Sequence, residues 1–150
     1  MNKQIALSDL AYVAGFIDGE GCITLVPHKP GGKRRDGYTL RVLITNTNKP
    51  VLVWIQSLFG GYLGQRVRRS RNHKISWELC VGSGYAEYMI QQIYPWLKMK
   101  KAQAEIGLKF RETVNKRRTA YDRDGVPREV RVKRDRMYRE IHRLNRKGPG

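Results

Sequence analysis

The sequence predicts an α+β domain whose elements run helix, two strands, helix, two strands and helix, with extra helices toward the C-terminus. Two observations predict this order. Apolar residues recur at helical spacing in some segments and alternate with polar residues in others, which is typical of half-buried strands. Glycine, proline and asparagine separate these segments, so each one is bounded by a turn. We expect the four strands to form an antiparallel sheet whose apolar face is covered by helices.

Length and charge limit the classes of function. The chain has 150 residues, which is enough for one domain with a real core. Its 30 lysines and arginines against 13 aspartates and glutamates give a formal net charge of +17, so a polyanion such as nucleic acid is the first candidate partner. No apolar run approaches the roughly 18 residues of a spanning helix, and no signal peptide opens the chain. We therefore expect no membrane partner and an intracellular location, cytoplasmic or organellar, with Cys22 and Cys80 reduced.

The first helix ends in a glycine-rich turn that carries one acid. Ser8 is its expected N-cap, and Asp9 then lies in the first turn, where the helix dipole favours a negative charge. Gly19 and Gly21 permit the backbone angles of a tight helix exit, and Glu20 stands between them. The apolar stripe of this helix consists of Leu10, Val13, Ala14 and Ile17.

A second face of this helix carries only small side chains. Ala11 and Gly15 lie four residues apart, so that face lets two backbones approach closely. We expect a partner to pack there through Ala11, Ala14 and Gly15, which places the acid at the helix tip on a symmetry axis. The alternative is an ordinary helix with a glycine cap.

The middle of the chain predicts two hairpins separated by a helix. Residues 22–28 and 38–45 alternate as strands, and their long loop carries a basic tip of Lys33, Arg34 and Arg35. Asn46 begins a strand-to-helix junction, in which Pro50 suits the first turn of a helix that ends before Gly60. The third and fourth strands are expected at residues 62–69 and 74–81.

The C-terminal part predicts helices. One helix is expected at about 84–93, and Pro95 interrupts it before another at about 98–115, whose stripe carries Ala102, Ile106 and Phe110. We assign residues 1–115 to the core and 116–150 to a basic extension of the same domain, with a helix at about 131–146. The extension is interpreted as phosphate contact flanking the core site. A disordered tail is the alternative.

The second face of the sheet combines hydrogen-bonding groups with cations. Such a face suits the major groove of DNA, where arginine contacts guanine and hydroxyl groups adapt to either partner. A solvated face is the alternative. Each strand of about seven residues spans roughly 24 Å, or about seven base pairs, so two copies would contact a long, near-palindromic site. The candidate DNA-binding residues are Thr24, His28, Lys33, Arg34, Arg35, Thr39, Arg41, Arg66, Arg68, Lys74, Ser76 and Glu78.

Three segments share the pattern of one known family. The run VAGFIDGEG at 13–21, preceded by LAY, resembles the LAGLIDADG signature of homing endonucleases. Thr45-Asn46 and the run PWLKMKKAQA at 95–104 resemble two further segments of that family. The resemblance implies an αββαββα fold and a metal-dependent endonuclease, encoded within introns or inteins, that cuts both DNA strands across the minor groove and leaves 3′ overhangs. A single copy of the motif implies a homodimer.

The resemblance also implies roles for particular residues. Glu20 is the expected metal ligand and catalytic carboxylate, and the Gly19 carbonyl is the expected second ligand. The family usually has Asp at the position of Glu20. Mg²⁺ is typically held by one or two carboxylates with phosphate oxygens and waters, and metal-assisted hydrolysis activates such a water. Asn46, where the family often has Gln, either orients the hydrolytic water or only forms the junction turn. Lys100 matches the family's catalytic lysine, whose charge can stabilise the phosphate. Asp18 is interpreted as structural.

Two other classes of function remain open at this level. A relative that binds nucleic acid without cutting it, such as an RNA maturase that assists intron splicing, would add intron RNA as a partner. A basic RNA-binding protein of the ribosomal type would explain the charge but not the acid in the glycine turn. The presence of both Glu20 and Lys100 favours the endonuclease.

Overall fold

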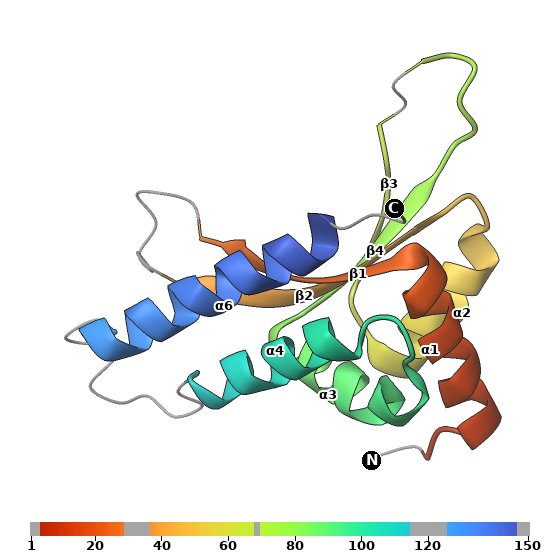
Figure 1. Ribbon diagram of the computed structural model, residues 1–150. Helices are drawn as coiled ribbons and strands as arrows, with labels where there is room; N and C mark the ends of the chain where they lie inside the picture. Colours follow the sequence, from red (N-terminus) through yellow and green to blue (C-terminus); the bar gives the residue numbers. More distant parts are fainter. Residues whose placement is uncertain (1–3, 29–36, 68–69, 115–125, 147–150) are drawn as a thin grey trace.

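The computed structural model describes residues 4–28, 37–67, 70–114 and 126–146, which form helices packed against one sheet (Figure 1). The sheet is antiparallel and has the strand order β1-β2-β4-β3, so β1 and β3 are its edges. The predicted α+β class and its four-stranded sheet are therefore confirmed. The elements are α1 (Leu7–Glu20), β1 (Gly21–Pro27), β2 (Tyr38–Asn46), α2 (Lys49–Phe59), β3 (Tyr62–Gln65), β4 (Trp77–Gly82), α3 (Ser83–Ile93), the 3-10 turn η1 (Tyr94–Trp96), α4 (Lys101–Glu112) and α6 (Arg128–Arg146).

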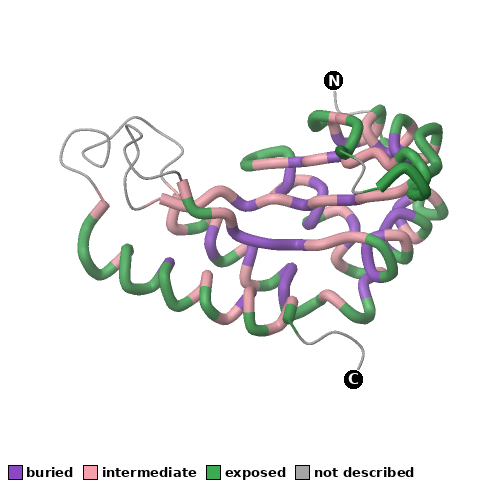
Figure 2. Tube along the Cα trace, turned by 90° about the horizontal axis from the view of Figure 1, so that it is seen from above, coloured by how far each residue is buried: buried purple, intermediate pink, exposed green. Residues whose placement is uncertain are grey.

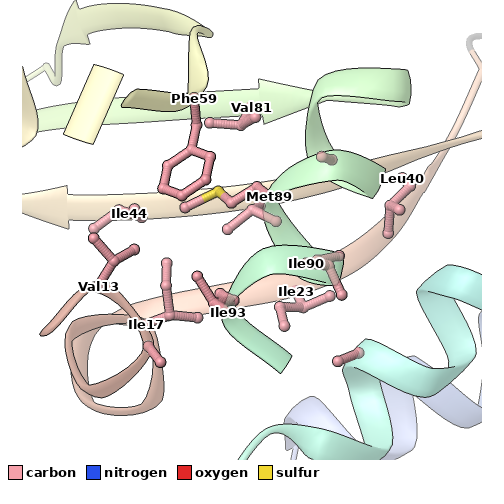
Figure 3. Close-up of a cluster of buried hydrophobic side chains, with 14 of the residues drawn as sticks. Val13, Ile17, Ile23, Leu40, Ile44, Phe59, Val81, Met89, Ile90 and Ile93 are labelled. Carbon is pink, nitrogen blue, oxygen red and sulfur yellow. The ribbon is translucent and has the colours of Figure 1, made fainter. Parts of the chain in front are cut away.

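The core lies between one face of the sheet and the helices. Buried and half-buried positions alternate along the central strands, as the sequence pattern predicts (Figure 2). Side chains from α1 and α3 point onto this face, where Val13, Ile17 and Ile93 meet Ile23 and Ile44 (Figure 3). Burial of these aliphatic groups is the main stabilising term of the fold.

Helix α1 begins one residue before Ser8, so the predicted Ser8 cap is wrong. The N-cap is Ala6, without a side-chain hydrogen bond, and Asp9 lies in the first turn as expected. Gly19 and Gly21 were expected at the end of α1 because glycine permits special backbone angles, and this reason is also wrong. Among the described glycines only Gly60 and Gly61 have positive φ. Gly21 is needed for space, since a Cβ there would lie 3.0 Å from the backbone of Ile17.

The second hairpin pairs over a shorter length than the sequence predicts. Strand β3 ends at Gln65 and strand β4 begins at Trp77. Arg66, Lys74 and Ser76 therefore lie outside both strands. One further backbone bond, from the Arg66 N–H to the Ser76 carbonyl at 2.9 Å, continues the pairing. This hairpin projects beyond the helices (Figure 1), so no core lies beneath its apolar residues to fix a longer strand.

Helix α4 also differs from its prediction. It begins at Lys101 rather than near residue 98, because the three preceding backbone N–H groups bind a side chain of α1, as described below. Ala102 is exposed, so its place on the buried stripe is wrong. The buried residues are Gln103, Ala104, Gly107 and Phe110. A Cβ at Gly107 would lie 2.8 Å from Leu40, so this glycine allows α4 to approach β2 closely.

Helix α6 packs beside α4 and along the edge strand β1 (Figure 1). Ile141 is fully buried in the core, and the Asn145 side-chain amide donates to the Ile23 carbonyl at 3.0 Å. Tyr138 stacks on Tyr38 with ring centroids 5.0 Å apart. The alternative of a disordered tail is therefore wrong for residues 126–146. None of the helices described in the chain is long and apolar enough to cross a membrane.

Candidate functional site

The predicted acid lies at the junction of α1 and β1. Glu20 is the last residue of α1 and is exposed. Gly21 pairs with Ile44 of β2, so the register places Glu20 beside the end of β2, where Thr45 and Asn46 follow. The Ile17 carbonyl accepts the last helical bond, from the Gly21 N–H, and the carbonyls after it lack helical partners. The Asp18 carbonyl accepts from the Lys100 ammonium instead, and the Gly19 carbonyl is next in the same turn.

Asp18 joins this junction to the segment that precedes α4. Its carboxylate accepts hydrogen bonds from the backbone N–H groups of Lys98 at 2.7 Å, Met99 at 3.1 Å and Lys100 at 3.0 Å. The Lys100 Nζ also donates to the Asp18 carbonyl at 2.6 Å. Asp18 is only 8% exposed, so these bonds replace the water that its charge would otherwise bind. This geometry supports the structural interpretation of Asp18 and places Lys100 beside the end of α1.

Asn46 takes part in the strand-to-helix turn. Its side-chain oxygen accepts from the backbone N–H of Asn48 at 2.7 Å, and the Asn48 side chain in turn accepts from the Val51 N–H at 3.1 Å as the cap of α2. Of the two alternatives for Asn46, the junction turn is thus present in the structure. Its amide nitrogen remains a donor that this turn does not use.

Two further residues near this corner were not predicted as site residues. The Lys49 ammonium lies 4.1 Å from the ring centroid of Trp77, which is the partner of Asn46 across the sheet. The thiol of Cys22 lies close enough to Lys100 to be affected by its charge: burial raises the pKa of Cys22, and Lys100 lowers it by a smaller amount. Lys49 is one of 30 Lys and Arg residues, so the sequence does not single it out. Its place near the corner is evident only from its contact with Trp77, the cross-strand partner of Asn46.

The face of the sheet opposite the core, called here the outer face, adjoins this corner. The register places Thr24 beside Arg41 and Thr45 beside Glu78 on this face. The His28 ring nitrogen bonds the Thr39 hydroxyl at 2.8 Å, and the Thr45 hydroxyl donates to Glu78 at 3.4 Å. The paired residues of the outer face are Cys22, Thr24, Val26, Thr39, Arg41, Leu43, Thr45, Tyr62, Gly64, Glu78, Cys80 and Gly82.

The predicted DNA-binding residues divide into three groups. Thr24, His28, Thr39, Arg41 and Glu78 come together on the outer face, although Thr24 is only 8% exposed and contributes little surface. Arg66, Lys74 and Ser76 lie on the projecting hairpin. Lys33, Arg34, Arg35 and Arg68 lie outside the described residues.

The predicted partner-binding face of α1 is only partly available. Ala14 is fully buried in the core of its own chain, so its assignment to an interface is wrong. Gly15 is exposed, and a Cβ built there meets no atom within 4 Å. Large apolar groups not predicted from the sequence flank this face: Tyr12 is exposed and its ring lies 5.6 Å from that of Trp54.

Comparisons with known proteins give one curated relative and several similar structures. The chain is 32% identical over 108 residues to the DNA endonuclease I-CvuI of Chlorella vulgaris. This alignment covers 67% of this chain and 62% of that protein. The aligned part thus spans less than two thirds of the relative's length. No protein-family model matches the chain.

Solved structures share the fold. The homing endonuclease I-CvuI in complex with its target aligns with a TM-score of 0.72 and 20% identity, covering 95% of this chain and 83% of that one. The archaeal intron-encoded homing endonuclease I-Vdi141I, complexed with DNA, gives 0.70 and 16%, covering 94% and 86%. The LAGLIDADG homing endonuclease I-LtrWI, bound to target DNA, gives 0.60 and 21%, covering 92% of this chain and 46% of that one.

Proposed function

Since the chain belongs to the LAGLIDADG homing endonuclease family, we propose that it is a sequence-specific, metal-dependent endonuclease that cuts both strands of DNA. The observation that carries the proposal is that the end of α1, the end of β2 and the start of α4 bring Glu20, Asn46 and Lys100 to one corner beside the outer face. These residues come from α1, β2 and the start of α4, so only the folded chain brings them together. The relative I-CvuI is itself a DNA endonuclease, and one of its structures is a complex with its target.

The corner suits a divalent cation, which we propose to be Mg²⁺. Glu20 offers an exposed carboxylate and Gly19 a carbonyl in the last turn of α1, where the helix dipole also favours a cation. Hard oxygen donors of this kind are the ligands that Mg²⁺ prefers. The described residues contain no group of three or more His, Cys, Asp or Glu side chains that could hold a metal ion. The remaining ligands would therefore be phosphate oxygens, waters and groups of a second copy. When bound, the cation supplies an activated water and neutralises phosphate charge.

The side chains at the corner have separate roles in this proposal. Lys100 stabilises the negative charge that develops on the phosphate, because its ammonium is fixed at the end of α1. The amide nitrogen of Asn46 donates to the hydrolytic water and orients it, while the oxygen of the same side chain remains in the turn. The Glu20 carboxylate accepts a hydrogen bond from that water and holds it for in-line attack at phosphorus. The non-cleaving alternative would not need an acid and a lysine held together in this way.

We further propose that two copies act together and leave 3′ overhangs. One chain contributes one Glu20, whereas cutting both strands requires two such groups, one for each scissile phosphate. The exposed Gly15 face of α1 lets two helices approach, and this contact brings the two Glu20 residues to the dimer axis. The two outer faces then continue away from the axis along one duplex, so the target is long and near-palindromic. Such a target implies an intracellular protein with access to DNA.

Replacement of the acid tests this function. Glu20→Gln keeps the size of the side chain but removes its charge, so it should abolish cutting while the protein still binds the same DNA in Ca²⁺. Glu112→Gln, a change of the same kind at the far end of α4, is the matched control and should cut like the wild type. A Glu20→Gln protein that cuts at the wild-type rate would exclude Glu20 as the metal ligand.

A further inference from the structure

A row of four residues without charge crosses the whole outer face. The register pairs Cys22 with Leu43, Leu43 with Cys80, and Cys80 with Tyr62, so the row runs over all four strands. Directly paired residues of an antiparallel sheet share a face, with Cβ atoms about 4.5–5.5 Å apart. The four side chains therefore form one continuous strip, called here the apolar row.

The apolar row lies between two rows of different chemistry. On the side nearer the catalytic corner, Thr45 pairs with Glu78. On the other side, Thr24 pairs with Arg41. Successive rows on one face are two residues apart, or about 6.8 Å along the strand. At a rise of about 3.4 Å per base pair, each row corresponds to about two base pairs.

The members of the apolar row offer methyl, thiol and ring surface. Cys22 and Cys80 are free cysteines, and such thiols behave as small apolar groups with only a weak S–H donor. Tyr62 is 75% exposed, and its ring lies over Gly64, where a Cβ would be 3.0 Å from the ring. Leu43, in the middle, is half-buried. Apart from Val26 and two glycines, the rest of this face carries hydrogen-bonding groups and the cation Arg41, so the apolar strip at its centre suits a partner with apolar groups at that position.

We propose that the apolar row determines specificity by contacting the 5-methyl groups of thymine in the major groove. The thymine methyl is the apolar group that base edges present there. This assignment rests on the proposed function and adds to it the order of chemistry within each half-site. From the cut outward, Glu78 accepts from the exocyclic amine of cytosine, the apolar row contacts thymine, and Arg41 contacts guanine.

The experiment removes the methyl groups one at a time. Randomised duplex DNA is first selected for binding in Ca²⁺, and each thymine of the enriched site is then replaced by uracil, which lacks only the 5-methyl group. Uracil should weaken binding about fourfold per methyl group at the position two to four base pairs from the cut, and should have no effect elsewhere in the half-site.

Protein variants assign this effect to the row. Leu43→Gln should abolish the uracil effect and change the preference at that position to adenine, which glutamine contacts with two hydrogen bonds. Leu43→Met should preserve the thymine preference. Val26→Gln, on the same face but outside the row, is the matched control and should leave the uracil effect intact.

The outcomes separate this assignment from the proposed function. A protein that enriches no DNA sequence overturns both. A specific site that binds equally well with uracil at every position overturns the assignment of the apolar row and leaves the endonuclease intact. A uracil effect that survives in Leu43→Gln also overturns it.

Discussion

Lys100 is bound to Asp18 at two points: its backbone N–H donates to the Asp18 carboxylate at 3.0 Å, and its ammonium donates to the Asp18 carbonyl at 2.6 Å. Asp18 is two residues from Glu20 in the same helix. Asp18 therefore sets the position of Lys100 relative to Glu20.

Asp18→Asn should reduce cleavage through Lys100. The amide keeps one acceptor but turns an NH₂ group toward backbone N–H donors, so the segment at 98–100 shifts. Loss of charge-assisted bonds of this kind costs about 1–3 kcal/mol. In single-turnover assays the rate should fall at least tenfold in the wild-type background and little further in Lys100→Ala, while binding in Ca²⁺ is unchanged.

Asp135→Asn is the matched control for this variant. Asp135 also accepts a hydrogen bond from another element, the Tyr38 hydroxyl, but Tyr38 begins β2 at the end opposite Asn46. The Asp135→Asn protein should lose some stability, but the cleavage rate of the folded protein should not change. If Asp18→Asn slows Lys100→Ala as much as it slows the wild type, Asp18 does not act through Lys100.

Hydrogen exchange tests the same contact without any activity. The amides of Lys98, Met99 and Lys100 precede the first turn of α4, so their protection depends on the Asp18 carboxylate. In Asp18→Asn these three amides should exchange much faster than in the wild type, whereas those in the middle of α4 should not. Equal protection in both proteins would contradict the contact.

Two glycines on different helices should respond oppositely to substitution. A Cβ at Gly15 meets nothing in its own chain, so Gly15→Leu should fold with equal or greater stability, because leucine favours helices by up to about 1 kcal/mol over glycine. It should nevertheless sediment as a monomer, because the added side chain separates the two α1 helices. Gly107→Ala should instead destabilise the fold, since its Cβ would lie 2.8 Å from Leu40. A dimeric Gly15→Leu protein would contradict the proposed interface.

Stability should fall at high pH because of Tyr38. Burial is the main cause that raises the pKa of Tyr38, and its hydrogen bond to Asp135 adds to the effect. The folded state thus favours the neutral phenol. Its contribution is complete below the ordinary tyrosine pKa of about 10 and is lost as pH rises from there toward the higher folded pKa. Tyr38→Phe should remove this part of the decline in urea midpoints between pH 9 and 11. An identical decline in both proteins would contradict it.

The elements that bury apolar side chains could be predicted from the sequence. Alternation in β1 and β2 and the stripe of α1 correspond to a face that packs on a core, so Ile23, Val42 and Ile17 are buried as their spacing indicates. The wrong predictions for the start of α4 and for the second hairpin concern segments whose structure depends on distant residues. The start of α4 depends on Asp18, about 80 residues earlier in the chain, and the length of β3 and β4 depends on where the helices stop covering the sheet.

The candidate site divides in the same way. Glu20 and Lys100 were identified by their motifs, whose spacing along the chain the sequence displays directly. The Lys49–Trp77 contact and the apolar row depend on which residues become neighbours across strands and helices. Neither composition nor periodicity contains that information.

The proposed function depends on DNA cleavage at the corner formed by Glu20, Asn46 and Lys100. Its most direct test is to incubate the protein with a library of randomised duplex DNA in Mg²⁺, with a Ca²⁺ control, and to sequence the cut ends. We expect cuts in Mg²⁺ alone, at one long, near-palindromic site, with 3′ overhangs, and none with Glu20→Gln. Retention of a specific DNA or of a structured RNA without any cut would contradict it.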